Sequence, residues 1–209
     1  MAERTEDKIN QTYPVWCFVL LWTLVMIFPL RVHGQVNFGG FVPDDENYAV
    51  TLAPLGGYEQ LDFGIVFLGQ GLVNIEMNSE DVVIVAVEAV RYLDVYVHLD
   101  APQFLYLDGN VTNDDERRIP FSLYGAYANR GSGNTSPADR MAFPGHSARF
   151  AVFRRPSGPP RPPPTPPHSG YVPPRETAYI ILYGDITLPS GLITGEYEAE
   201  VLIEVSYDI

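Results

Sequence analysis

The sequence predicts an all-β protein, a β-sandwich of antiparallel strands. Apolar and polar residues alternate with a period of two over most of the chain after Gln35. Glycine and proline are abundant, at 18 and 19 residues, and aromatic residues reach 12%, a composition typical of short strands joined by turns. The length of 209 residues is sufficient for one domain with a sizeable core.

The first 34 residues are predicted to be a signal peptide. An apolar run extends from Val15 to Leu30, shorter than the roughly 20 residues of a membrane span, and small Gly34 follows it at a plausible cleavage position. We therefore expect cleavage after Gly34, a mature chain that begins at Gln35, and no membrane insertion after cleavage. An uncleaved membrane anchor is the alternative. Residues 35–209 are predicted to form a single domain.

Charge and cysteine content narrow the classes of partner. The net charge of −13 lies entirely after residue 34, because acidic and basic residues balance before it. Such a field repels phosphates and anionic lipid, so we expect no nucleic-acid partner. Cys17, the only cysteine, lies in the apolar run, so the rest of the chain can form no disulfide and no cysteine-ligated metal site.

Segments of alternating or wholly apolar residues, bounded by turn residues, predict the strands. In chain order they are Leu61–Phe67, Leu72–Met77, Val82–Val90, Leu93–Leu99, Ile119–Tyr127, Arg149–Phe153, Tyr179–Leu188 and Tyr197–Tyr207. Val82–Val90 is almost wholly apolar and β-branched, so we expect a central strand buried on both faces. Short strands at this turn-punctuated spacing imply an immunoglobulin-like sandwich.

The C-terminal strand has the clearest pattern. One face carries Tyr197, Ala199, Val201, Ile203, Val205 and Tyr207, and the other face carries mainly glutamates. A slip of one residue would bury four of these glutamates, so the register is strongly fixed. A second alternating segment lies near the start of the predicted domain, where Tyr48, Val50 and Leu52 share one face.

A proline-rich tract interrupts the strand pattern. Ten prolines lie between Pro156 and Pro174, counting both ends, and such a tract favours polyproline II over a strand. We predict an exposed loop that is dispensable for folding. A docking site for a proline-recognition module is the alternative interpretation.

No enzyme is predicted, and no cofactor or metal. The four histidines, His33, His98, His146 and His168, have no metal-ligand spacing, and the sequence has no nucleophile elbow, phosphate loop or dinucleotide fingerprint. Two acidic segments, 44–46 and 108–116, are interpreted as acidic loops. Because oxygen-rich loops bind Ca²⁺, a Ca²⁺ site at Asp108–Glu116 stays open as the alternative.

Two stretches resemble a known family. They are Leu61-Asp62-Phe63-Gly64 followed by Val73 and Ile75, and the C-terminal run from Leu182-Tyr183-Gly184-Asp185 through Gly195-Glu196-Tyr197 to Tyr207. They resemble the domain of unknown function 4402, a pilin-like family similar to spore coat protein U and to archaic chaperone–usher pilus subunits. The likeness spans most of residues 54–209.

The resemblance implies an exported structural or adhesive subunit, in the periplasm or at the cell surface of a bacterium, without catalytic residues. Its partners would be other copies or related surface subunits, with a periplasmic chaperone. In such pilins the C-terminal strand lines a groove that a neighbour's N-terminal strand fills. The groove candidates are Tyr197, Val201, Ile203, Val205 and Tyr207; the donor-strand candidates are Tyr48, Val50 and Leu52. Alternatively, the donor segment pairs within its own chain.

Two other functions stay open. The first is a standalone exported module that binds Ca²⁺ or carbohydrate. A concave site lined by aromatic residues such as Tyr124 and Tyr127 would favour it. The second is a hydrolase on a β-sandwich, which clustered carboxylates in a cleft would favour.

Overall fold

The computed structural model describes residues 39–40, 46–56, 59–91, 93–154 and 172–208. By internal contacts the chain divides into Met1–Gly34 and Gln35–Ile209, and all described residues belong to the second unit. The predicted signal peptide and most of the proline-rich tract therefore lie outside the described residues. Within the described residues, no helix is long and apolar enough to cross a bilayer.

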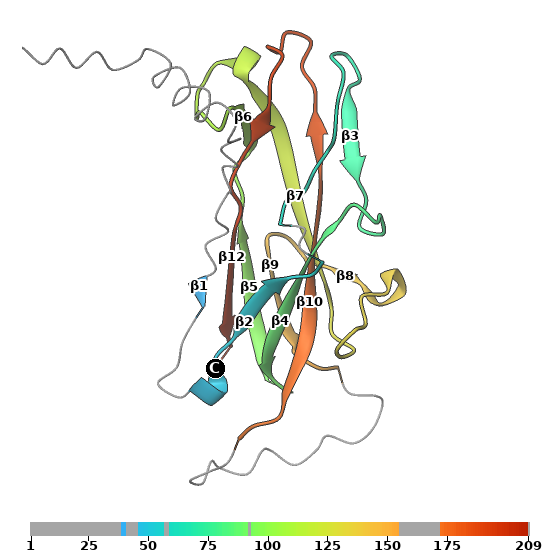
Figure 1. Ribbon diagram of the computed structural model, residues 1–209, viewed down its shortest axis with the longest axis vertical. Helices are drawn as coiled ribbons and strands as arrows, with labels where there is room; N and C mark the ends of the chain where they lie inside the picture. Colours follow the sequence, from blue (N-terminus) through green and yellow to red (C-terminus); the bar gives the residue numbers. More distant parts are fainter. Residues whose placement is uncertain (1–38, 41–45, 57–58, 92, 155–171, 209) are drawn as a thin grey trace, which may run out of the picture. The chain divides into compact units, whose positions relative to one another are not determined.

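The described part of the chain is nearly all β-structure, which confirms the predicted class (Figure 1). The strands are β1 (Gly39–Gly40), β2 (Thr51–Pro54), β3 (Leu72–Ile75), β4 (Val83–Val90), β5 (Asp94–Asp100), β6 (Phe104–Leu107), β7 (Arg118–Ala128), β8 (Met141–Ala142), β9 (Ser147–Ala151), β10 (Arg175–Thr187), β11 (Tyr197–Glu198) and β12 (Leu202–Tyr207). Short 3₁₀ helices lie at η1 (Glu46–Tyr48), η2 (Asp115–Arg117) and η3 (Pro137–Asp139).

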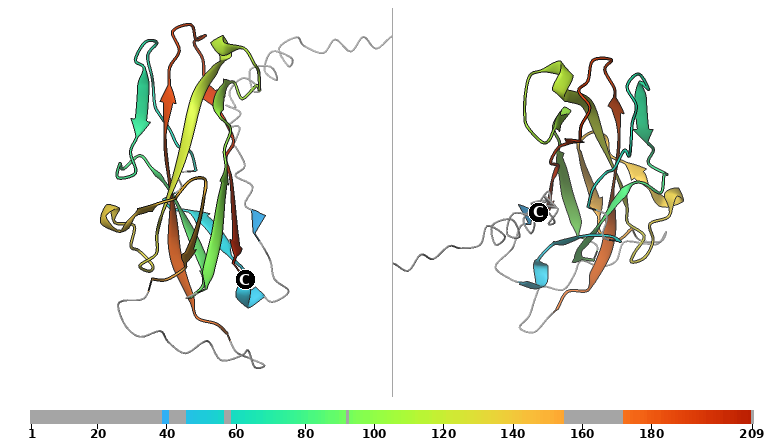
Figure 2. Two further views of the ribbon diagram at one scale, coloured as in Figure 1. Left: turned by 180° about the vertical axis from the view of Figure 1, so that it is seen from behind. Right: turned by 45° about the horizontal axis from the view of Figure 1, so that its top comes forward.

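The strands form two sheets that pack as a sandwich. The larger sheet has the order β11-β6-β7-β10-β4-β2, with β3 also beside β10 and β8 beside β7. The smaller sheet has the order β1-β12-β5-β9, and only β1 pairs in parallel. The order β2-β4-β10-β7 matches strands A-B-E-D of an immunoglobulin domain, and the β12–β5 pair matches strands F and C. Figure 2 shows from behind that β12 lies along β5.

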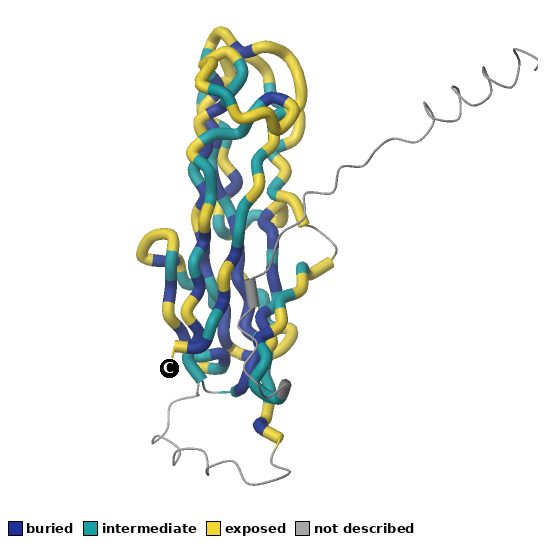
Figure 3. The backbone as a smooth tube through the Cα atoms, turned by 90° about the vertical axis from the view of Figure 1, so that its left-hand side faces the viewer, coloured by how far each residue is buried: buried dark blue, intermediate teal, exposed yellow. Residues whose placement is uncertain are grey.

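One main core lies between the two sheets. It takes buried residues from both, among them Val87 and Ile180 of the larger sheet and Val97 and Val205 of the smaller one. Figure 3 shows the buried residues along the strands and mostly exposed residues in the loops at the top of the view. Each fully buried aliphatic side chain contributes about 1.5–3 kcal/mol, so this core carries most of the stability.

The predicted strand at Leu61–Phe67 is wrong. Gly64 has a φ of +69°, and the Asp62 carboxylate accepts a 2.8 Å hydrogen bond from the Gly64 N–H. This local turn takes the place of a strand ladder. Leu61, Phe63 and Val66 nevertheless pack against the core, and the ring of Phe63 meets that of Phe121 edge-on at 6.1 Å. Ile65 and Phe67, which continue the alternation, are instead exposed.

The predicted continuous strand at Tyr197–Tyr207 is also corrected, because it is divided between the two sheets. β11 pairs with β6 of the larger sheet, and β12 pairs with β5 of the smaller sheet. Residues 199–201 connect the two strands without regular pairing. Alternation fixes which face each side chain takes, but it does not say which strand will be the partner.

The remaining predicted strands occur with shifted ends. β9 begins two residues before the predicted Arg149, and β10 begins at Arg175, four residues before the predicted Tyr179. The short strands β6 and β8 were not predicted, because four-residue and two-residue strands are too short to show a period.

Candidate functional site

The C-terminal strand β12 turns an apolar face to the core and a polar face outward. All six of its residues pair antiparallel with β5, from Leu202 opposite Asp100 to Tyr207 opposite Val95. Ile203, Val205 and Tyr207 are buried, and Glu204 is exposed. The predicted register is therefore observed in this part of the run.

The other edge of β12 pairs with only a two-residue strand. Among the described residues, its pairing there is a parallel one with β1, in which Gly39 lies opposite Glu204 and Gly40 opposite Val205. In an immunoglobulin domain this edge belongs to strand G, which covers strand F along its length. Glycine offers no side chain to pack and weakens a strand. At the β12 edge the described sandwich therefore has two glycines where an immunoglobulin domain has a full strand, and we take this edge as the candidate site.

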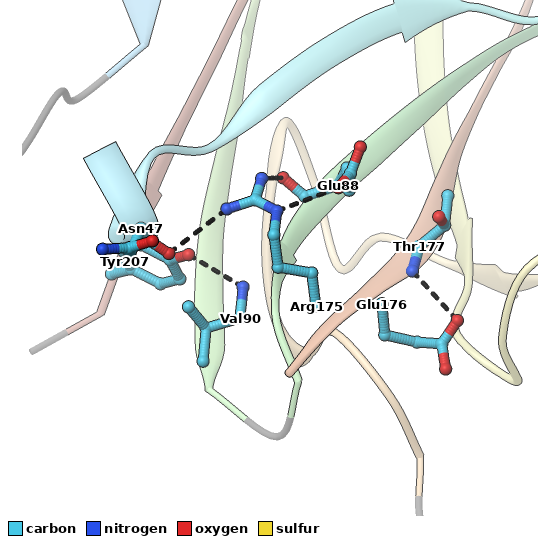
Figure 4. Close-up of polar contacts among 7 residues, drawn as sticks. All are labelled: Asn47, Glu88, Val90, Arg175, Glu176, Thr177 and Tyr207. Carbon is cyan, nitrogen blue, oxygen red and sulfur yellow. Dashed lines mark hydrogen bonds and ion pairs between the residues drawn. The ribbon is translucent and has the colours of Figure 1, made fainter. Parts of the chain in front are cut away.

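Tyr207 fastens the end of β12 to the opposite sheet (Figure 4). Its hydroxyl oxygen accepts a 2.9 Å hydrogen bond from the backbone N–H of Val90, at the end of β4. Burial raises the pKa of Tyr207 above its usual value of 10.0, although the Val90 N–H and the charge of Arg175 act in the opposite direction. The neutral phenol is therefore the favoured form in the fold.

A second set of contacts holds the N-terminal segment at the same end (Figure 4). Arg175 donates hydrogen bonds to the side chain of Glu88 at 2.9 Å, to its backbone carbonyl at 3.0 Å, and to the carbonyl of Asn47 in η1 at 3.4 Å. Because Arg175 is on β10 and Glu88 on β4, the turn at Asn47 is attached to the larger sheet.

The donor-strand candidates pack within their own chain in this structure. β2 pairs antiparallel with β4, with Leu52 opposite Val87. Val50 is buried in the main core, and Tyr48 and Leu52 pack against it. This is the arrangement that the intrachain alternative describes. Strand exchange between copies stays a prediction.

The other groove candidates belong to a different part of the sandwich. Tyr197 lies on β11, and its hydroxyl lies 2.7 Å from the carbonyl oxygen of Ile193 and 3.2 Å from that of Glu116. Val201 lies in the connection before β12. The structure thus brings Ile203, Val205 and Tyr207 together on one strand and places Tyr197 beside β6.

The acidic loop is held by its own contacts. Asp114 caps η2 by accepting a 3.1 Å hydrogen bond from the Glu116 N–H, and Asp115 forms an ion pair with Arg118. Within the described part of the chain, no group of three or more histidines, cysteines and carboxylates could hold a metal ion. Asp44 and Asp45 lie outside that part.

The two tyrosines suggested for a ligand site lie on opposite faces of β7. Tyr127 points into the core, where its ring stacks on Phe150 at 4.3 Å and an interplanar angle of 4°. Tyr124 is 44% exposed and lies on the outer face beside Tyr183 of β10, with ring centroids 5.5 Å apart. The odd spacing from Tyr124 to Tyr127 already indicated opposite faces, but only the strand pairing shows that Tyr183 is the neighbour.

Comparisons of this chain with protein-family models, with curated proteins and with solved structures give no match. The likeness to the domain of unknown function 4402 therefore stays a prediction from the residues that carry it.

Proposed function

We propose that this chain is an exported structural or adhesive subunit of a bacterial surface, and that the β12 edge accepts a strand from another copy. The observation that carries the proposal is that β12 has a well-buried inner face but a sparsely paired outer edge. Its inner face is buried along Ile203, Val205 and Tyr207, whereas its outer edge pairs only with Gly39 and Gly40 among the described residues.

An edge of this kind gives strand addition a physical basis. A strand that is added there forms main-chain hydrogen bonds along β12, and its alternate side chains can enter the sandwich beside the core. Left open, such an edge is also an aggregation hazard. Because an open edge has to be covered before assembly, we also propose that a periplasmic chaperone binds it until then.

The N-terminal segment is the natural donor by position. One stretch of chain runs from β1 on the edge of β12 to β2 on the edge of β4, and so reaches both sheets. β2 is built into the larger sheet, and Val50, directly before it, lies in the core, whereas β1 contributes two glycines. We therefore propose residues 35–45 as the exchanged part, in place of the donor-strand candidates Tyr48, Val50 and Leu52, with β2 kept in its own chain.

The test compares the full-length mature chain, residues 35–209, with a variant of it that lacks residues 35–45. Sedimentation velocity should show oligomers of the full-length chain that grow with concentration, and monomers of the variant. Fluorescence anisotropy should then show saturable binding of a labelled peptide of sequence 35–45 to the variant. A scrambled peptide of the same composition is the control.

Two results would contradict the proposal. One is a full-length chain that stays monomeric at high concentration. The other is a deletion variant that folds but binds the 35–45 peptide no better than the scrambled peptide. Circular dichroism of the variant distinguishes this second result from a failure to fold.

A further inference from the structure

The outer face of the larger sheet carries an ordered row of polar side chains next to a pair of tyrosines. Pairing of β3 with β10 places Asn74 opposite Asp185, and pairing of β10 with β7 places Asp185 opposite Ser122. Tyr183, two residues before Asp185 and on the same face of β10, lies opposite Tyr124. Directly paired residues share a face, so these five side chains form one surface. They come from β3, β10 and β7, which lie next to one another in the larger sheet (Figure 1).

This surface faces away from the main core. Leu182 and Ile186, which alternate with Tyr183 and Asp185 along β10, belong to the core between the sheets. Tyr183 packs at the margin of a smaller apolar cluster on the outer face, which includes Tyr179 and Ile181. The hydroxyl of Tyr179 accepts a 2.7 Å hydrogen bond from the Gly133 N–H of the η3 loop, so this margin is firmly held.

The polar row is free to bind a ligand. Among the described residues, the side chains of Asn74, Asp185 and Ser122 take part in no hydrogen bond or ion pair with one another or with other groups. Together they offer a carboxylate acceptor, an amide that both donates and accepts, and a hydroxyl. Asn74 is exposed, and the other two are partly exposed.

The tyrosine pair supplies the complementary apolar contact. The ring planes are inclined by 35°, and Tyr124 is 44% exposed. The faces of aromatic rings are electron-rich and attract C–H groups that carry a partial positive charge, such as those of a sugar ring. A pyranose has this dual chemistry, with C–H groups on its faces and hydroxyls at its edge.

We propose that this surface, formed by Tyr124, Tyr183, Asn74, Asp185 and Ser122, binds a neutral saccharide. The sugar ring lies against the tyrosines, and its hydroxyls donate to Asp185 and exchange hydrogen bonds with Asn74 and Ser122. The carboxylate of Asp185, in a chain of net charge −13, disfavours sialic and uronic acids. The site is separate from the β12 edge, so the inference does not depend on strand exchange.

The experiment passes the full-length chain over agarose columns carrying glucose, galactose, mannose or N-acetylglucosamine, with sialic acid as the acidic probe. We expect retention on at least one neutral column and elution by the free sugar. Tyr124→Ala and Asp185→Ala should each weaken binding about ten-fold, equivalent to about 1.4 kcal/mol.

The chain offers a matched control in Tyr96. It is 43% exposed, against 44% for Tyr124, but lies on β5 of the smaller sheet. Tyr96→Ala should leave sugar binding unchanged, and thermal melts of all variants report whether they fold.

The proposal is overturned if no neutral column retains the chain, or if folded Tyr124→Ala binds like the parent. If no column retains the parent and sedimentation shows that Tyr124→Ala abolishes self-association, the tyrosine surface is a contact between copies instead of a sugar site.

Discussion

Replacing Tyr207 by Phe tests whether one hydrogen bond between the sheets stabilises the end of β12. The substitution keeps the ring and removes the hydroxyl that accepts from the Val90 N–H. Tyr207 is 8% exposed and Val90 is 6% exposed, so water cannot readily replace the lost acceptor. A buried donor left unpaired costs about 1–3 kcal/mol, and we expect the free energy of unfolding to fall by that amount.

Urea unfolding at neutral pH, followed by far-ultraviolet circular dichroism, measures the loss. The pH dependence gives a second measurement. The pKa of Tyr207 is raised in the fold, so its contribution is fully present below the unfolded value of 10.0 and is lost as the pH rises above it. The parent should therefore lose stability above about pH 10, and Tyr207→Phe should lose less over the same range. The Tyr207→Phe variant keeps part of this pH dependence, because burial also raises the pKa values of Tyr183 and Tyr197.

Tyr96→Phe is the control, because the ring of Tyr96 is exposed on β5 and its hydroxyl bonds to no described residue. It should change the free energy of unfolding by less than about 0.5 kcal/mol. A Tyr207→Phe protein as stable as this control, with the alkaline dependence of the parent, would refute the reasoning.

Two further predictions concern a close contact and the proline-rich tract. Gly184→Ala should destabilise by about 1–3 kcal/mol in urea unfolding, because a β-carbon there would meet the Ser122 carbonyl oxygen; Gly145→Ala, which meets nothing within 4 Å, should be nearly neutral. Equal stability of the two variants would contradict this. Replacing residues 156–171 with a short Gly-Ser loop should shift the thermal midpoint by only a few degrees, provided that Pro174, whose carbonyl accepts from the Arg91 N–H, is kept. A collapse of the midpoint would show that the tract packs on the core.

Side-chain alternation was a good guide to faces and a poor guide to partners. It correctly placed Ile203, Val205 and Tyr207 on the inner face of β12. It did not show that the same run changes sheet between β11 and β12. It also predicted a strand at Leu61–Phe67, where the Asp62–Gly64 turn supplies a local hydrogen bond instead. Local competition of this kind leaves the apolar spacing intact, so the spacing alone cannot reveal it.

The sequence by itself determined the all-β class, the positions of the long strands and the inward face of each, because a period of two follows from backbone geometry alone. Only the tertiary structure decided which strands meet. It set Tyr183 beside Tyr124 from positions 59 residues apart, and it laid Gly39 and Gly40 along β12. Both candidate surfaces are products of strand pairing, which joins residues distant in the chain through backbone groups. Every residue type carries the C=O acceptor, and every type except proline carries the N–H donor, so side-chain patterns do not reveal the partner.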